Sequence, residues 1–123
     1  MTKPRARDLG LPFRGTPGRF NAITDVAGVK VGFTTLTDPA KNMRTGVTAI
    51  LPRDEKGSPS PVWAGFHSFN GNGEMTGTHW VNDAGYFLGP VMITNSHGIG
   101  AVHHGTTRWM IEHYDTYFTN DHA

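Results

Sequence analysis

The sequence predicts an α/β domain, or part of one, in which several strands precede one long helix. Alternating and fully apolar runs occur between residues 29 and 94, and they are typical of strands. Apolar side chains recur at helical spacing over residues 99–114. The chain has 123 residues, within the usual size of a domain of about 100–150 residues. We therefore expect residues 1–123 to form a single domain or a portion of one.

The first 22 residues are expected to form an extended arm, because prolines and glycines interrupt every stretch that could become a helix. We expect this arm to lie on the surface of the domain, anchored by Leu11, Phe13 and Phe20. The basic start of the chain is not followed by an apolar segment, which is unlike a secretory signal. A cytoplasmic location is therefore expected.

Four strands are expected to form a mixed sheet after a short strand and a turn at residues 25–28. These four are residues 29–36, 45–51, 62–69 and 90–94. The first two are expected to form an antiparallel hairpin, and the third carries bulky side chains on both faces, as buried strands do. Residues 53–61 are expected to be a mobile surface loop, and residues 79–87 a short helix or turn.

The helix expected over residues 99–114 should pack on this sheet through one apolar face. The side chains expected to be buried there are Val102, Thr106, Trp109 and Met110.

Composition excludes several classes of protein. There is no cysteine, so disulfides, thiolate metal sites and a cysteine nucleophile are excluded within these residues. The net charge of +1, from 11 basic and 10 acidic residues, argues against a nucleic-acid partner. The chain contains no run of 18 apolar residues, so no transmembrane helix and no membrane partner are expected.

Residues 70–77, Asn-Gly-Asn-Gly-Glu-Met-Thr-Gly, form the first candidate site because glycines let a backbone approach a ligand closely. Its candidate residues for a substrate pocket or oxyanion site are Asn70, Gly71, Asn72, Gly73 and Glu74. Successive N–H groups in such a turn can cradle an anion. The spacing is not that of a nucleotide-binding loop. A tight glycine turn without a ligand is the alternative interpretation.

Asn95 and His97 form the second candidate site, between the last expected strand and the helix. Polar groups at the carboxyl end of a buried strand often line a pocket. Asn95 or Ser96 could instead simply cap the helix. If the strands at 62–69 and 90–94 are parallel neighbours, the two candidate sites meet at one end of the sheet.

No complete catalytic set is visible in this sequence. None of the serines lies in a Gly-x-Ser-x-Gly motif. Seven histidines are present, but none forms a His-Glu-x-x-His motif. A histidine metal site is therefore only an alternative hypothesis, and we expect no metal and no cofactor.

Four segments carry a family resemblance. They are the motifs Asn-Ala-Ile-Thr-Asp-Val-x-Gly-Val-x-Val-Gly-x-Thr-Thr-Leu at 21–36, Arg-Thr-Gly-Val-Thr-Ala-Ile-Leu-Pro at 44–52, Asn-Gly-Asn-Gly-Glu-Met-Thr-Gly-Thr-His-Trp at 70–80, and Gly-Pro-Val-Met-Ile-Thr-Asn at 89–95. The chain resembles the β-peptidyl aminopeptidases and L-aminopeptidase/D-Ala-esterase/amidases. The resemblance covers nearly all of this chain and about the first third of a family precursor.

The resemblance implies an α/β/β/α sandwich of the N-terminal nucleophile hydrolase type, of which this chain is the N-terminal portion. It implies a precursor that cleaves itself at a Gly–Ser bond, freeing a serine nucleophile whose α-amino group acts as base. Substrates would be short peptides or amides with a free N-terminal amine. The partners would be the remaining α-chain segment and the β chain, and the αβ units would form a homo-oligomer.

The sequence departs from the family pattern by ending at Ala123, before the family's cleavage site and nucleophile. The carboxylate that binds the substrate amine in the family also lies further on. Glu74 is therefore expected to stiffen its own loop, with contact to the substrate ammonium as the alternative. No catalytic residue is expected on this chain, and the chain alone should be inactive. A non-catalytic remnant or assembly module of the same fold is the alternative function.

Overall fold

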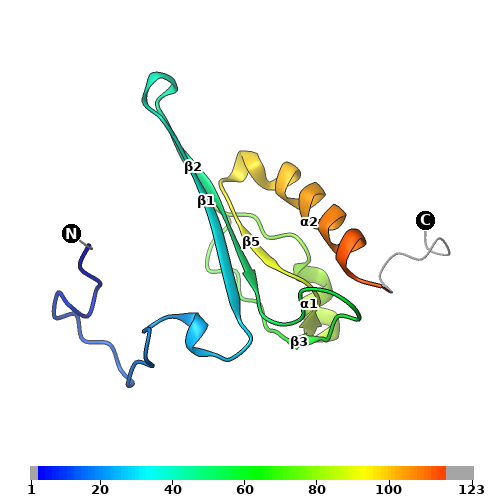
Figure 1. Cartoon of the computed structure of the whole chain (residues 1–123), viewed down its shortest axis with the longest axis horizontal. Coiled ribbons are helices and arrows are strands. Elements are labelled where there is room, and N and C mark those ends of the chain that lie inside the picture. The colour runs from blue at the N-terminus through cyan, green and yellow to red at the C-terminus, as the bar shows by residue number, and fades with distance from the viewer. Residues whose placement is uncertain (1–2, 116–123) are drawn as a thin grey trace.

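A long antiparallel hairpin organises the chain. The computed structural model describes residues 3–115, and in it β1 (Lys30–Asp38) pairs with β2 (Met43–Leu51) over the full length of both strands. The short 3-10 helix η2 (Pro39–Lys41) closes the turn, with the Asp38 carboxylate accepting a hydrogen bond from the Ala40 N–H. The closed end of the hairpin projects beyond the other elements (Figure 1). The expected hairpin is therefore confirmed.

The sheet of the described residues is antiparallel, which corrects the expected mixed sheet. β5 (Val91–Ile93) pairs antiparallel with β2, with Ala49 opposite Met92, and the strand order is β1-β2-β5. This pairing confirms the expected last strand. The parallel pairing that was considered for residues 62–69 and 90–94 does not occur, because β3 and β5 pair with different strands.

The expected strand at residues 62–69 was wrong over most of its length. Only β3 (Val62–Trp63) is a strand, and it pairs antiparallel with β4 (Tyr86–Phe87) in a separate two-stranded sheet. Residues 65–69 are exposed and have no partner strand within residues 3–115. Alternating bulky side chains indicate compatibility with a strand, but they do not supply the neighbouring strand that completes its hydrogen bonds.

Two helices complete the fold. α1 (Thr78–Ala84) lies where a short helix or turn was expected, and it ends at Gly85 in a left-handed conformation, as helices commonly do. α2 (Ile99–His113) confirms the expected long helix, and it runs beside β5 (Figure 1). The short strand expected before residue 25 is instead a 3-10 helix, η1 (Ile23–Asp25), since its backbone hydrogen bonds are local.

The register expected for α2 agrees with the structure, although coverage is partial. All four side chains expected to be buried, Val102, Thr106, Trp109 and Met110, are half-buried. The Met110 side chain of this helix lies close to Gly89: a Cβ on Gly89 would lie 3.0 Å from the Met110 sulfur, and Gly89 has a φ of +82°. Glycine at residue 89 therefore meets both a steric and a backbone requirement.

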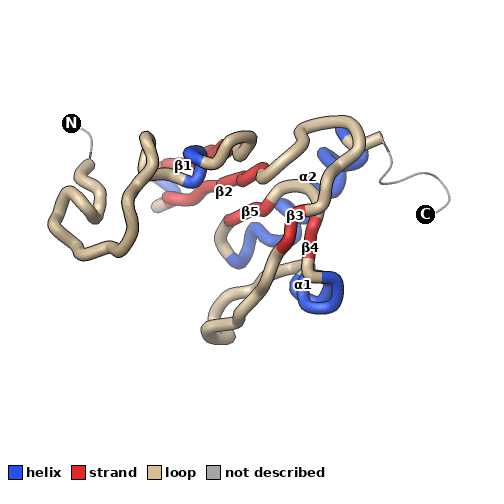
Figure 2. Tube along the Cα trace, turned by 90° about the horizontal axis from the view of Figure 1, so that it is seen from below, coloured by secondary structure: helices blue, strands red, loops and turns tan. Residues whose placement is uncertain are grey.

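The N-terminal arm, of which residues 3–22 are described, is not anchored on the domain. Leu11, Phe13 and Phe20 are 52%, 55% and 56% exposed, so the expected anchoring is wrong. Figures 1 and 2 both show the arm extending away from the helices. The partners of Phe13 and Phe20 lie within the arm itself, where the guanidinium groups of Arg7 and Arg19 lie over their rings.

Much apolar surface is uncovered elsewhere too. Tyr114 is the one large apolar residue that is buried among residues 3–115, whereas Phe33, Trp63 and Phe69 are 76%, 82% and 91% exposed. The outer edge of β1 has no partner strand in the described chain. Within that same part, no helix combines the length and the apolar character needed to cross a bilayer.

We expect residues 1–123, expressed alone, to aggregate or to be only partly folded, because unpaired strand edges and apolar faces favour association. Thermal unfolding and size-exclusion chromatography of the isolated polypeptide would measure this. A sharp, cooperative melt of a monomer would show instead that these residues are a self-sufficient domain.

Candidate functional site

The start of α2 is held to β2 through Asn95. The Asn95 side-chain oxygen accepts a hydrogen bond from the Gly98 N–H at 2.9 Å, and its amide nitrogen donates to the Thr45 hydroxyl at 2.7 Å. Thr94 adds a hydrogen bond from its hydroxyl to the Gly46 carbonyl. Asn95 is thus the N-cap of η3 (Ser96–Gly98), the turn that leads into α2. Asn95 therefore caps the turn before the helix and not α2 itself, whose N-cap is Gly98 without a side-chain cap.

His97 lies within η3 and is exposed. Within residues 3–115 its ring makes no hydrogen bond and no ion pair. The structure therefore places His97 at the surface beside the helix start without giving it a partner in this part of the chain.

The loop at residues 70–77 is exposed along its whole length. Asn70 organises its first turn: its side-chain oxygen accepts from the Asn72 N–H at 2.9 Å, and its carbonyl accepts from the Ser68 hydroxyl. Glu74 makes no hydrogen bond or ion pair within the described residues. No contact within the described residues therefore supports the expectation that Glu74 stiffens its own loop.

Nothing within residues 3–115 requires glycine at positions 71 and 73. Neither has a positive φ, and a Cβ built on either meets no atom within 4 Å. A tight turn would require glycine through one of these two effects. Space beside the backbone is therefore open at both positions.

The two candidate sites are not joined in the way the sequence predicted. β3 pairs with β4 and β5 pairs with β2, so the strands that precede the two sites belong to different sheets. Across residues 3–115 no hydrogen bond links residues 70–77 to residues 95–97. The rule that parallel neighbours bring their carboxyl ends together does not apply, because both pairings are antiparallel.

An aromatic cluster that the sequence analysis missed flanks the loop at residues 70–77. The Tyr86 ring is approached edge-on by Trp63 and by Trp80, with ring centroids 6.4 and 5.5 Å away. Such edge-to-face pairs are a favoured aromatic geometry. Helix α1, which contains Trp80, begins directly after the loop. The packing of Trp80 on Tyr86 therefore holds the C-terminal end of the loop in place. No periodicity in the sequence relates the three rings.

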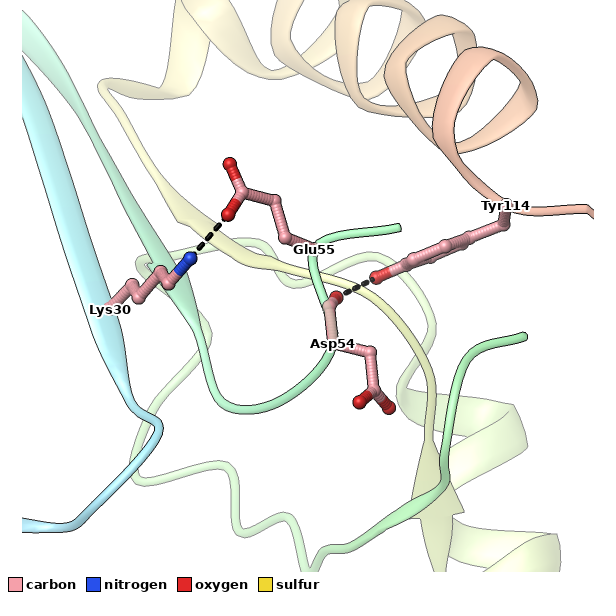
Figure 3. A network of polar contacts seen from close by, with 4 residues as sticks. All are labelled: Lys30, Asp54, Glu55 and Tyr114. Carbon is pink, nitrogen blue, oxygen red and sulfur yellow. Dashed lines mark hydrogen bonds and ion pairs between the residues drawn. The ribbon is translucent and has the colours of Figure 1, made fainter. Parts of the chain in front are cut away.

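The loop at residues 53–61 was expected to be mobile, yet it is bonded to the end of α2 (Figure 3). The Tyr114 hydroxyl donates to the Asp54 carbonyl at 2.9 Å. The backbone of Gly57 bonds on both sides of Tyr114: its N–H donates to the His113 carbonyl, and its carbonyl accepts from the Asp115 N–H. We call this set of contacts the α2 clasp.

Charges around the clasp are also paired. Glu55 forms an ion pair with Lys30 (Figure 3), which lowers the pKa of the Glu55 carboxyl. Hydrogen bonds from Ser60 lower the pKa of Asp54. Burial, and then the Asp54 charge, raise the pKa of the Tyr114 hydroxyl. Tyr114 is therefore a neutral donor at neutral pH, as its bond to the Asp54 carbonyl requires.

Metal-ligating side chains do not gather in the described part of the chain, where no three His, Asp or Glu residues converge. The His113 ring stacks on Trp109 at 4.5 Å between centroids and lies 2.8 Å from the Trp109 carbonyl. Its position is explained by packing at the end of α2.

Comparison with known proteins decides the family. The family model described as "Peptidase family S58" matches residues 21–122. The chain belongs to peptidase family S58. This finding confirms the resemblance drawn from the four sequence motifs.

Two curated relatives are β-peptidyl aminopeptidases named BapA. The protein from Sphingosinicella microcystinivorans is 52% identical over 116 residues, covering 89% of this chain. The protein from Sphingosinicella xenopeptidilytica is 50% identical over 118 residues, covering 90%. In both comparisons this chain spans only 29% of the relative's length.

Solved structures confirm the fold class. The L-aminopeptidase D-Ala-esterase/amidase from Ochrobactrum anthropi, described as a variant of the Ntn hydrolase fold, matches with a TM-score of 0.81 and 58% identity. This match covers 95% of this chain and 35% of that one. The PH0078 protein from Pyrococcus horikoshii OT3 matches with a TM-score of 0.76 and 36% identity, over 89% of this chain and 33% of that one. The described elements thus form part of an Ntn-hydrolase-type fold.

We expect Tyr114→Phe to lower the free energy of unfolding of the complete protein by about 1 kcal/mol, because it removes the hydrogen bond to Asp54 and leaves that carbonyl unpaired. Chemical denaturation would measure the change. Tyr86→Phe is the matched control, since the Tyr86 hydroxyl makes no hydrogen bond within residues 3–115. Equal effects of the two substitutions would contradict a stabilising role for the α2 clasp.

Proposed function

We propose that this chain is the N-terminal portion of the α chain of a self-processing serine aminopeptidase. The observation that carries this proposal is the backbone match to the Ochrobactrum anthropi enzyme across 95% of this chain at 58% identity. At such identity, both the fold and the surfaces that line a shared site are expected to be similar. The complete protein would remove N-terminal residues from short peptides, amides or esters.

The nucleophile in this proposal is a serine on a segment outside this chain. The serines described here are already used or exposed: the Ser68 hydroxyl bonds to the Asn70 carbonyl, and Ser96 lies in the helix-capping turn. A weak hydroxyl nucleophile needs an adjacent base, and no serine within residues 3–115 is hydrogen-bonded to a histidine. Ser60 is bonded to the Asp54 carboxylate, and these hydrogen bonds lower the pKa of Asp54, which makes that carboxylate a weaker base. The α-amino group of a serine freed by self-cleavage would supply that base without a cofactor.

Within this mechanism, residues 70–77 are proposed to line the substrate site. The support is the open space beside Gly71 and Gly73, which the described chain neither fills nor requires. Backbone N–H groups there, or the Asn70 amide, could then face a developing oxyanion. Asn95 has a different role in this proposal: it positions the start of α2, because both ends of its side chain already make hydrogen bonds.

The proposed partners are the rest of the α chain and the β chain, with several αβ units in one particle. The extent of uncovered apolar surface supports this, because isolated domains rarely expose so much. Small peptides or amides with a free amine would be the substrates, and β-peptides or D-residues are finer possibilities that the relatives' names suggest. The competing proposal, a non-catalytic assembly module, rests on the same exposed surface.

Maturation of the complete protein tests the proposal directly. We expect the purified particle to contain two polypeptides, the smaller beginning with serine, and to hydrolyse β-alanyl or L-alanyl p-nitroanilide. Intact mass spectrometry with N-terminal sequencing, followed by the chromogenic assay, would show this. A single uncleaved, inactive polypeptide would favour the non-catalytic module.

Substitution of Asn70 tests the proposed site. Asn70→Ala in the complete enzyme should lower kcat by about 10²-fold or more if the amide donates to the oxyanion, and maturation should be followed in the same samples. Asn82→Ala, an exposed asparagine of α1, is the control and should leave kcat unchanged. Wild-type turnover of a normally matured Asn70→Ala enzyme would show that the loop is a structural turn.

A further inference from the structure

The segment between β3 and α1 begins and ends beside one tyrosine ring. β3 ends at Trp63 and α1 begins at Thr78, and we call residues 64–77 between them the 64–77 loop. In Figure 2 this loop leaves β3 and returns at α1, so both of its ends lie near β4. Tyr86, the first residue of β4, is contacted from both ends of the loop.

The first end of the loop is held by strand pairing and by a ring contact. Trp63 lies directly opposite Tyr86 in the β3–β4 pair, and the two rings meet edge to face, with their planes at 89°. The next residue adds a backbone hydrogen bond, from the Ala64 N–H to the Gly85 carbonyl at 2.9 Å. Backbone and side chain therefore both fix the point at which the loop starts.

The second end of the loop is held through α1. Trp80, in the first turn of this helix, meets the Tyr86 ring edge to face at 5.5 Å between centroids. Gly85 brings the two rings together, because its φ of +74° turns the chain back after α1, a conformation that glycine adopts readily. The N-cap of α1, Gly77, provides no side-chain cap. Placement of this end therefore depends on the Trp80–Tyr86 contact.

Between its two ends the loop has only local hydrogen bonds. The bonds from Ser68 to Asn70 and from Asn72 to Asn70 each join residues two positions apart. Within the described part of the chain, no hydrogen bond joins residues 65–76 to another element. The position of the loop is therefore set at its ends, and both ends pack on Tyr86.

We propose that Tyr86 is a positioning residue for catalysis: its ring holds Trp63 and Trp80, and through them it places the segment that contains Asn70. This inference rests on the proposed function, in which residues 70–77 line the substrate site. Donors to an oxyanion stabilise the transition state only when they are already in place, and a displacement of about 1 Å can cost about 10²-fold in rate. Loss of the ring therefore lowers kcat more than it raises KM.

Kinetics of the complete, matured enzyme test the role of the ring. Tyr86→Leu should lower kcat by about tenfold or more and leave KM nearly unchanged. Tyr86→Phe keeps the ring and should retain the wild-type kcat, because the hydroxyl makes no hydrogen bond within residues 3–115. Each kcat is expressed per cleaved polypeptide, counted by mass spectrometry, so that a loss of maturation is not read as a loss of turnover.

Trp109→Leu is the matched control for simple destabilisation. Trp109 is also half-buried, and its ring meets Tyr114 close to edge-on, at the same 5.5 Å between centroids, but on α2. Both leucine variants should lower the melting temperature, whereas only Tyr86→Leu should lower kcat per matured enzyme.

A double variant tests whether Trp80 and Tyr86 act together. Trp80→Leu should lower kcat as Tyr86→Leu does, and combining the two should cost little more than either alone, because both remove the same contact. Fully additive losses would contradict action through one ring cluster.

Hydrogen exchange on the same samples reports on the loop without any need for turnover. Peptides that cover residues 64–77 should exchange faster in Tyr86→Leu than in Tyr86→Phe or the wild type. A wild-type kcat in matured Tyr86→Leu, an equal loss of kcat in Trp109→Leu, or unchanged exchange in an active enzyme would each overturn this inference alone. A wild-type protein that neither matures nor hydrolyses peptides would instead overturn the proposed function, and the catalytic role of Tyr86 with it.

Discussion

β2 is hydrogen-bonded along both of its edges, and the positions of the other elements depend on this strand. β1 extends along one edge for nine residues, and β5 along the other for three. The residues after β5 return to the same strand through the Thr94–Gly46 and Asn95–Thr45 hydrogen bonds. The start of α2 is thus set by β2 rather than by the helix's own sequence. A shift in the register of β2 would move the sheet and the helix start together.

Local signals were sufficient to predict the hairpin, β5 and α2. Alternation identified β1, the apolar run before Pro52 identified β2, and the recurrence of Val102, Thr106 and Trp109 identified α2. These patterns report the backbone geometry of each residue's own neighbourhood. The capping by Asn95 was also accessible, because an asparagine between a strand and a helix has few other common roles.

Pairings between distant residues could not be predicted in this way. β3 is two residues long because its partner, β4, is equally short and follows α1. The clasp between Tyr114 and the loop at residues 53–61 joins segments with no shared pattern. The same limit applies to the site. The glycines of residues 70–77 indicated a backbone that a ligand can approach, but the direction of the chain before this loop depends on the pairing of β3 with β4, which the sequence does not reveal.

The α2 clasp also has a consequence for the order in which this region can fold. The β1–β2 hairpin closes over a turn of four residues, Pro39–Asn42, whereas the hydrogen bond between Tyr114 and Asp54 spans 60 residues. Closing a long loop is entropically costly until contacts within it have formed, and contacts distant in sequence slow folding. On a ribosome, Asp54 and the hairpin emerge well before Tyr114 does. The hairpin can therefore form early, with the edge of β1 exposed. The clasp forms only later, after the end of α2 has left the ribosome.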